Sequence, residues 1–160
     1  MAVPQRPPEL AEFPIVFTMP LQWGDQDAFG HVNNVIYFRW FESARVIYLD
    51  QIGLHHLMQG NGLGPILASI HCNYRRQLNY PDTVHIGARV THLGNSSLKM
   101  QHVVYSDAQQ ALTADAESVI VTFDYTAQRS VRIPDPVRSQ IEQLEGRKFA
   151  PGDGSKAESH

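Results

Sequence analysis

The longest hydrophobic stretch of the chain follows Asn34 and ends before Gly53. It contains no proline or glycine, and four charged residues interrupt it: Arg39, Glu42, Arg45 and Asp50. Asn33 is a favourable N-cap, and Gly53 can adopt the left-handed conformation that often ends a helix. The pattern therefore predicts one long helix over residues 33–52. Because this helix is apolar on nearly every side, we expect it to be buried.

Elsewhere, apolar and polar residues alternate with a period of two, which is typical of strands with one core-facing side. A first strand is predicted ahead of the helix, over residues 13–23. Four more strands are predicted after it, over residues 66–74, 83–91, 98–104 and 119–125. Turns are expected at 94–95 and 106–110, and the glycine-rich segment 54–65 is predicted to be a loop that can begin with a helical turn. A short amphipathic helix is predicted after Asp135 as N-cap, with Pro136 at its first position.

This order of elements predicts an α+β fold in which an antiparallel sheet wraps one long central helix. Residues 1–12 are expected to be a flexible lead, residues 13–145 a single domain, and residues 146–160 a disordered tail. One helix cannot cover both faces of a sheet. We therefore expect a second copy to cover the remaining surface, in a homodimer or a homotetramer.

Composition narrows the possible partners and the compartment. The chain has 160 residues and a net charge of -3, so it has no strong positive field to attract nucleic acid or an acidic membrane. Its single cysteine, Cys72, cannot form an intrachain disulfide, which suits a reducing compartment. Residues 1–12 show no apolar signal-peptide core, and charges interrupt the long hydrophobic stretch. These features predict a cytoplasmic protein that does not insert into a membrane.

Candidate chemistry lies in the polar stretch from Asp25 to Asn34, just ahead of the long helix. The start of a helix carries unpaired backbone N–H groups and a partial positive charge, which together can stabilise an oxyanion. Asp27 is close enough in sequence to share a site with these groups and could act as a general base or a nucleophile. An equally good interpretation from the residues alone is that Asp25 and Asp27 cap the helix or line a turn that Gly30 permits.

Two segments resemble a known family. The first is Asp27-Ala28-Phe29-Gly30-His31-Val32-Asn33-Asn34. The second combines Tyr37 with Phe41-Glu42-Ser43-Ala44-Arg45. Together they resemble the hotdog-fold acyl-CoA thioesterases of the 4-hydroxybenzoyl-CoA thioesterase type, and a looser similarity continues to about Leu144. The resemblance implies the hotdog fold, hydrolysis of an acyl-CoA thioester, and sites at a dimer interface.

The resemblance also implies roles for individual residues. Asp27 would be the catalytic carboxylate, and the backbone N–H of Asn34 would polarise the thioester carbonyl. His31 would support Asp27 or serve a structural role near the helix start. Gly30 would lie against the substrate, and Tyr37 could contact the acyl group or belong to the core.

Further positions are candidates for holding the CoA part of the substrate. The turn at Ser96 and Ser97 resembles the family's glycine-serine turn near the thioester, although a plain hairpin turn explains it equally well. Basic residues that could bind the CoA phosphates are Arg75, Arg76, Lys99, Arg129 and Arg132, of which we select Arg76 and Arg129. Glu42 is a competing carboxylate on the helix, but Arg39 and Arg45 lie three residues to either side and favour an ion-pair cluster.

Other chemistries lack their motifs. The chain has no G-x-S-x-G elbow, no HExxH or cysteine-pair spacing for zinc, and no glycine-rich dinucleotide fingerprint. We therefore expect no metal and no cofactor apart from the CoA of the substrate. The alternative to a thioesterase is a non-catalytic hotdog protein that binds acyl-CoA or a protein partner through the same groove.

Overall fold

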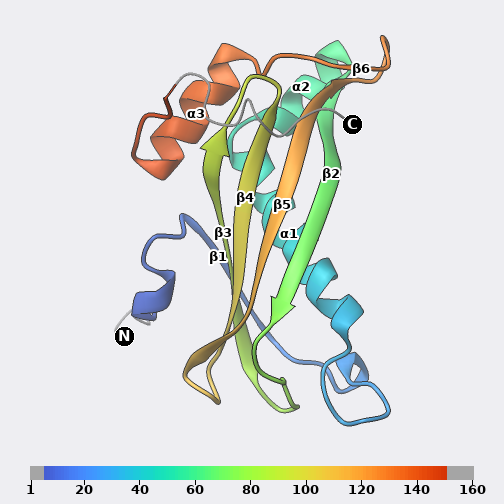
Figure 1. Ribbon diagram of the computed structural model, residues 1–160, viewed down its shortest axis with the longest axis vertical. Coiled ribbons are helices and arrows are strands. Elements are labelled where there is room, and N and C mark those ends of the chain that lie inside the picture. Colours follow the sequence, from blue (N-terminus) through green and yellow to red (C-terminus); the bar gives the residue numbers. More distant parts are fainter. Residues whose placement is uncertain (1–5, 151–160) are drawn as a thin grey trace.

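A computed structural model of the chain describes residues 6–150. One long helix, α1 (Asn34–Gln51), lies behind a curved antiparallel sheet (Figure 1). The strand order is β1-β3-β4-β5-β2, and β6 pairs with β5. The strands are β1 (Ile15–Pro20), β2 (Leu63–Tyr74), β3 (Thr83–Leu93), β4 (Ser97–Ser106), β5 (Ala111–Asp124) and β6 (Arg129–Ser130). The predicted antiparallel sheet around one central helix is confirmed.

Local signals at both ends explain where α1 begins and ends. The side-chain oxygen of Asn33 accepts a hydrogen bond from the N–H of Val35 at 3.0 Å, which caps the first turn. Ile52 is the C-cap, and Gly53 follows it with a φ of 78°, in the left-handed region. The predicted helix over residues 33–52 is therefore confirmed, with both end residues acting as caps.

The faces of α1 differ more than the sequence suggested. Tyr37, Phe41 and Tyr48 are buried in the core against the inner face of the sheet. Val35 and Val46 lie on the opposite side and are 59% and 56% exposed. The prediction that α1 is buried on nearly every side is thus wrong for the single chain, because its own sheet covers only one side of the helix.

Three other elements differ from the prediction. The expected loop over 54–65 is wrong: α2 (Leu54–Asn61) lies between two positive-φ glycines, and β2 already begins after Gly62. The first strand ends at Pro20, and a single 3₁₀ turn, η2 (Trp23–Asp25), follows it. The last helix, α3 (Asp135–Glu145), has Pro134 as its N-cap, one residue earlier than predicted.

The N-terminal segment packs on the outer face of the sheet. It contains the 3₁₀ turn η1 (Pro8–Leu10). Leu10 and Phe13 are buried with Val103 and Tyr105 in a small cluster separate from the main core. This packing of residues 6–12 differs from the flexible lead expected from the sequence. Residues 1–5 and most of the expected tail, residues 151–160, lie outside the described residues.

Candidate active site

The loop that leads into α1 is built around the carboxylate of Asp27. The N–H of Asp27 donates to the carbonyl oxygen of His31 at 2.8 Å, and the N–H of Gly30 donates back to the carbonyl oxygen of Asp27 at 3.1 Å. The Asp27 Oδ1 atom accepts from the N–H of Phe29 at 2.8 Å. Gly30 has a φ of 82°, which a residue with a side chain adopts only at a cost. One carboxylate oxygen thus holds the turn, while Oδ2 has no partner in residues 6–150.

The start of α1 lies beside this turn. The N–H of Asn33 donates to the carbonyl oxygen of Asp25 at 2.8 Å, which fixes the direction in which the chain enters the helix. The N–H groups of Val35 and Ile36 both bond to Asn33, at 3.0 Å each. The N–H of Asn34 has no hydrogen-bond acceptor among the described residues. It is therefore available to a ligand at the positive end of the helix.

Asp27 and the start of α1 line one groove with a volume of about 310 Å³. The groove residues are Asp27, His31, Val32, Asn34, Tyr37, Tyr74, Arg75, Arg76 and Gln77. Six of them were candidates from the sequence: Asp27, His31, Asn34, Tyr37, Arg75 and Arg76. The groove therefore places a carboxylate, a helix N-terminus and basic side chains around a single concave space.

Two tyrosines form the wall of this groove beside α1. The hydroxyl of Tyr74 donates to the carbonyl oxygen of Asn34 at 3.0 Å, which joins the end of β2 to the start of α1. The rings of Tyr37 and Tyr74 meet edge to face, with centroids 5.0 Å apart. Burial raises the pKa of both phenols, that of Tyr74 to about 12, so both are neutral hydrogen-bond donors at neutral pH. Burial likewise raises the pKa of Cys72 to about 11, and its thiol is therefore protonated and a poor nucleophile.

The two arginines of the groove differ in their partners. Arg75 Nε donates to Asp115 Oδ2 at 2.7 Å, and Asn73 donates to the other oxygen of the same carboxylate. Burial alone would raise the pKa of Asp115, but these two hydrogen bonds outweigh it and lower the pKa. Within residues 6–150, the guanidinium of Arg76 has no side-chain or backbone partner. Arg76 is thus the cation that is available to an anionic ligand.

The structure does not bring all the candidates together in one chain. Gly30 shapes the turn but is exposed and does not line the groove. Ser96 and Ser97 lie at the β3–β4 turn, and Arg129 lies in β6, at the end of the sheet opposite Asp27 (Figure 1). Sequence reasoning missed Tyr74 and Gln77 as groove residues. Tyr74 ends the strand predicted over residues 66–74, but nothing in the sequence placed it next to Asn34.

Glu42 lies outside the groove and is exposed. The predicted ion-pair cluster with Arg39 and Arg45 does not form within the described part of the chain, because no carboxylate lies within ion-pair distance of either guanidinium. Arg45 is instead buried, and its Nη1 atom has no hydrogen-bond partner. Burial lowers the pKa of Arg45, and the nearby charge of Glu42 partly offsets this effect.

Beneath Arg45 lies a buried histidine. His102 Nε2 is 3.2 Å from the Ser118 hydroxyl, its ring packs on Phe41 with centroids 5.3 Å apart, and its Nδ1 atom has no partner. Burial, together with the positive charge of Arg45, lowers the pKa of His102 to about 3. His102 is therefore neutral at physiological pH and cannot serve as a proton donor to a distant groove.

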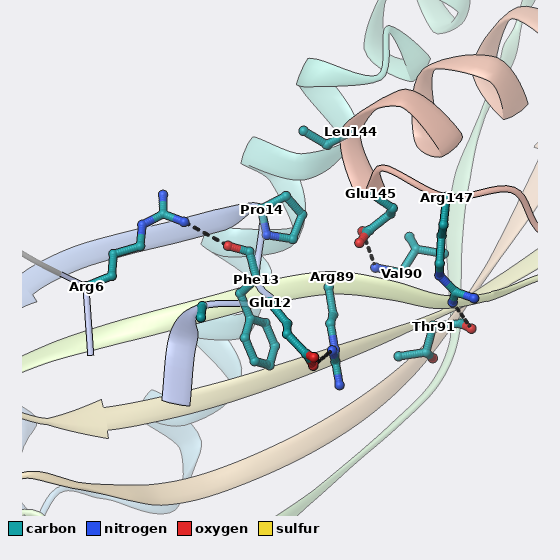
Figure 2. Close-up of a pocket in the computed structure, with 11 residues that line it drawn as sticks. Arg6, Glu12, Phe13, Pro14, Arg89, Val90, Thr91, Leu144, Glu145 and Arg147 are labelled. Carbon is teal, nitrogen blue, oxygen red and sulfur yellow. Dashed lines mark hydrogen bonds and ion pairs between the residues drawn. The ribbon is translucent and has the colours of Figure 1, made fainter. Parts of the chain in front are cut away.

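A larger hollow of about 540 Å³ lies between the N-terminal segment, β3 and the end of α3 (Figure 2). Its charged groups bind one another, the carbonyl oxygen of Phe13, or the backbone of the free edge of β3. Arg89 pairs with Glu12 at 2.7 Å, and Glu145 accepts from the N–H of Val90 at 2.7 Å. Arg147 donates to the carbonyl oxygen of Thr91, the residue that follows Val90 in β3. These contacts explain the hollow as a junction that covers a strand edge.

The described part of the chain offers neither a metal-binding cluster nor a membrane-spanning helix. Residues 6–150 contain no group of three or more His, Cys, Asp or Glu side chains arranged to hold a metal ion. Every helix in this range is too short or too polar to cross a bilayer.

Comparison with known proteins adds independent information. Over 118 residues the chain is 25% identical to the long-chain acyl-CoA thioesterase FadM of Escherichia coli, covering 74% of this chain and 89% of the relative. The crystal structure of a Thermus thermophilus thioesterase complexed with coenzyme A and Zn is 30% identical, with a TM-score of 0.76 over 87% of this chain and 99% of that one. The PA5185 protein of Pseudomonas aeruginosa is 29% identical, with a TM-score of 0.74 over 88% of this chain and 96% of that one.

The profile of one family, described as the Thioesterase-like superfamily, matches residues 21–141. This range includes the Asp27 turn, α1 and every strand except β1. The fold is the hotdog fold that the sequence predicted, while nothing in these similarities singles out the 4-hydroxybenzoyl-CoA subtype. The chain belongs to the Thioesterase-like superfamily.

Proposed function

We propose that this thioester hydrolase cleaves acyl-CoA in the groove formed by the Asp27 turn and the start of α1. One observation carries the proposal: the Asp27 carboxylate and the unpaired N–H of Asn34 line the same concave space. A developing oxyanion needs a preorganised donor, and a water or acyl carbon needs a nearby base or nucleophile. The groove supplies both requirements from a single local segment of chain.

The making and breaking of bonds in the proposed reaction needs only the Asp27 carboxylate and the N–H of Asn34. The thioester carbonyl would accept a hydrogen bond from the N–H of Asn34, at the positive end of the helix. Asp27 would either deprotonate a water that attacks the carbonyl carbon, or attack it directly to form an anhydride that water then cleaves. In both routes the carbon–sulfur bond breaks, and the products are a carboxylate and the thiol of CoA. His31 would orient the water or substrate, and no resident cofactor takes part.

Similarity to FadM and to the CoA-bound Thermus thioesterase supports CoA as the carrier. Among the described residues, Arg76 is the cation of the groove wall that has no partner, and it is therefore our candidate for binding a CoA phosphate. Tyr37 would contact the acyl part, and Gly30 would allow the turn to approach the substrate. The cytoplasm, as a reducing compartment, suits the free thiol of Cys72.

We also propose that the working form is a homodimer, or a tetramer built from such dimers. β2 is an edge strand of the sheet, and Leu67 on it is 42% exposed. A long unpaired edge next to exposed apolar side chains favours pairing with a second chain. If two β2 edges pair antiparallel, the far end of one sheet approaches the Asp27 end of the other. Ser96, Ser97 and Arg129 could then reach the partner's groove.

The flank of α1 beside β2 supports the same arrangement. Arg45 has an unsatisfied buried nitrogen, and Glu42 lies on the same flank without an ion-pair partner in residues 6–150. Two antiparallel copies of α1 would place Arg45 of each copy near Glu42 of the other. Such a reciprocal arrangement is the one that a two-fold axis requires.

The direct test is a panel of acyl-CoA substrates of increasing chain length, incubated with the protein and a reagent that detects free thiol. We expect saturable release of CoA with at least one acyl group. Tight binding of acyl-CoA without thiol release across the panel would instead support the non-catalytic hotdog protein.

A further inference from the structure

Three aromatic side chains are exposed at the end of the molecule that holds the Asp27 groove. Trp23 is 73% exposed, Phe29 is 82% exposed and Tyr80 is 42% exposed. The rings of Trp23 and Tyr80 meet edge to face with centroids 5.5 Å apart. Large aromatic side chains are normally buried, so three exposed ones at the same end of the molecule, two of them in contact, suggest a binding surface.

The aromatic pair is continuous with the groove. Gln77 lines the groove, and the three residues that follow it reach Tyr80. This short segment runs beside the Asp27 loop, because Val32 donates to the carbonyl of Leu78 at 2.9 Å and Tyr80 donates to the side chain of Gln26 at 3.4 Å. Three residues span at most about 11 Å, so the backbone of Tyr80 lies no farther than this from the backbone of Gln77 on the groove wall.

The pair has the geometry of a stacking platform for a flat ring. An edge-to-face contact with Tyr80 fixes the Trp23 indole while leaving much of its surface open. Aromatic side chains in this setting stack on nucleic-acid bases. An acyl chain is a poorer occupant, because a ring that is 73% exposed cannot shield an alkyl chain from water. The guanidinium of Arg76, which has no partner within residues 6–150, lies on the wall of the same groove, where it can bind phosphate.

We propose that Trp23 and Tyr80 stack on the adenine of the substrate's CoA, with Arg76 on its phosphates. This inference rests on the proposed thioesterase function and adds a preference for the CoA carrier. Thioesters that end at pantetheine lack the adenine and would gain nothing from the pair. Acyl groups carried on a protein phosphopantetheine arm lack it as well.

Kinetics on matched substrates test the proposal. The same acyl group is presented on CoA and on pantetheine, to the wild type and to Trp23→Ala. The alanine variant should lose about 5- to 160-fold in kcat/KM on acyl-CoA, the range for loss of one base stack, and stay within about twofold on acyl-pantetheine. Trp23→Phe should retain most of the activity. Equal losses on both carriers, or no loss on either, would overturn the proposal.

A binding measurement separates this inference from the hydrolysis itself. Adenosine 3′,5′-bisphosphate carries the nucleotide but no thioester, so its binding does not depend on Asp27. It should quench the tryptophan fluorescence of the wild type saturably, and Tyr80→Ala should weaken its binding. Normal acyl-CoA turnover without such quenching would reject the adenine site and leave the thioesterase intact. A change of oligomeric mass in Trp23→Ala would likewise overturn it, by showing that the pair is an interface between copies.

Discussion

Asn33 contributes both to the stability of α1 and to the proposed oxyanion site, and two substitutions separate these contributions. Its side-chain oxygen caps the N–H of Val35 at 3.0 Å, and its backbone is bonded to Asp25. Asn33→Ala removes the cap without adding charge. Asn33→Asp keeps an oxygen acceptor of the same shape but places a negative charge one residue from the N–H of Asn34.

The two variants should therefore affect different properties: Asn33→Ala should lower stability, and Asn33→Asp should lower kcat. Asn33→Ala should lower the free energy of unfolding by about 1 kcal/mol, the usual cost of losing an N-cap. Asn33→Asp should be as stable as the wild type, since aspartate caps equally well and its charge suits the helix dipole. Its carboxylate would repel the developing oxyanion. At a separation on the order of 6 Å and an effective dielectric constant of about 40, the repulsion is about 1.4 kcal/mol, or roughly tenfold in kcat.

Urea unfolding followed by circular dichroism gives the stabilities, and steady-state kcat on the best acyl-CoA gives the catalytic effect. The diagnostic result is a stable but slow Asn33→Asp variant. If that variant turns over at the wild-type rate, the oxyanion does not form at the start of α1. If both variants lose the same amount of stability, the loss does not come from removal of the N-cap.

Three further predictions concern the flank of α1 and the core beneath it. Glu42→Arg and Arg45→Glu should each weaken the proposed dimer, and mixing the two purified variants should restore a mixed dimer in native mass spectrometry, because each new charge then meets its opposite. Failure of the mixture to pair would remove α1 from the interface. The lowered pKa of His102, about 3, means that the unfolded chain binds a proton near pH 6.5 that the folded chain does not. Stability should then rise with pH, and a drop from pH 7 to pH 5 should cost about 2 kcal/mol, a dependence that His102→Gln loses in urea titrations. Cys72→Ala should keep kcat within about twofold. Iodoacetamide should label the native protein slowly at pH 8, because burial raises the pKa of Cys72 to about 11. Fast labelling with loss of activity would contradict the assignment of Cys72 as an unreactive thiol.

The elements that were predicted correctly are those with local signals. Asn33 and Gly53 mark the ends of α1 through capping geometry that depends only on neighbouring residues. The prediction failed for α2, where Gly60 lowers helix propensity but the two glycines at φ 78° and 68° allow an isolated helix to form between α1 and β2. The exposure of Val35 was also missed, because periodicity shows that a side is apolar and not whether the chain itself covers it.

The candidate site likewise contains residues that local sequence signals predicted and residues that they did not. Asp27 and Asn34 are seven positions apart on either side of one turn, so their meeting in the groove could be anticipated from the sequence. Tyr74 reaches the groove through the pairing of β2 with β5, and Gln77 lies three residues beyond the end of β2. No local pattern encodes such a contact between distant segments. Ser96 lies at the opposite end of the sheet, and its proposed contribution depends on a second copy, which a single chain cannot reveal.

The central claim is that Asp27 performs the chemistry, and the kcat of Asp27→Asn tests it most directly. The asparagine keeps the oxygen that accepts the N–H of Phe29 at 2.8 Å, so the turn and the fold should persist by circular dichroism. Glu42→Gln, which removes the competing carboxylate outside the groove, is the matched control, provided that native mass spectrometry finds the same oligomer as for the wild type. We predict that Asp27→Asn lowers kcat on acyl-CoA by about 10²- to 10⁴-fold, while the kcat of Glu42→Gln stays near that of the wild type. A folded Asp27→Asn variant with wild-type kcat would contradict the account.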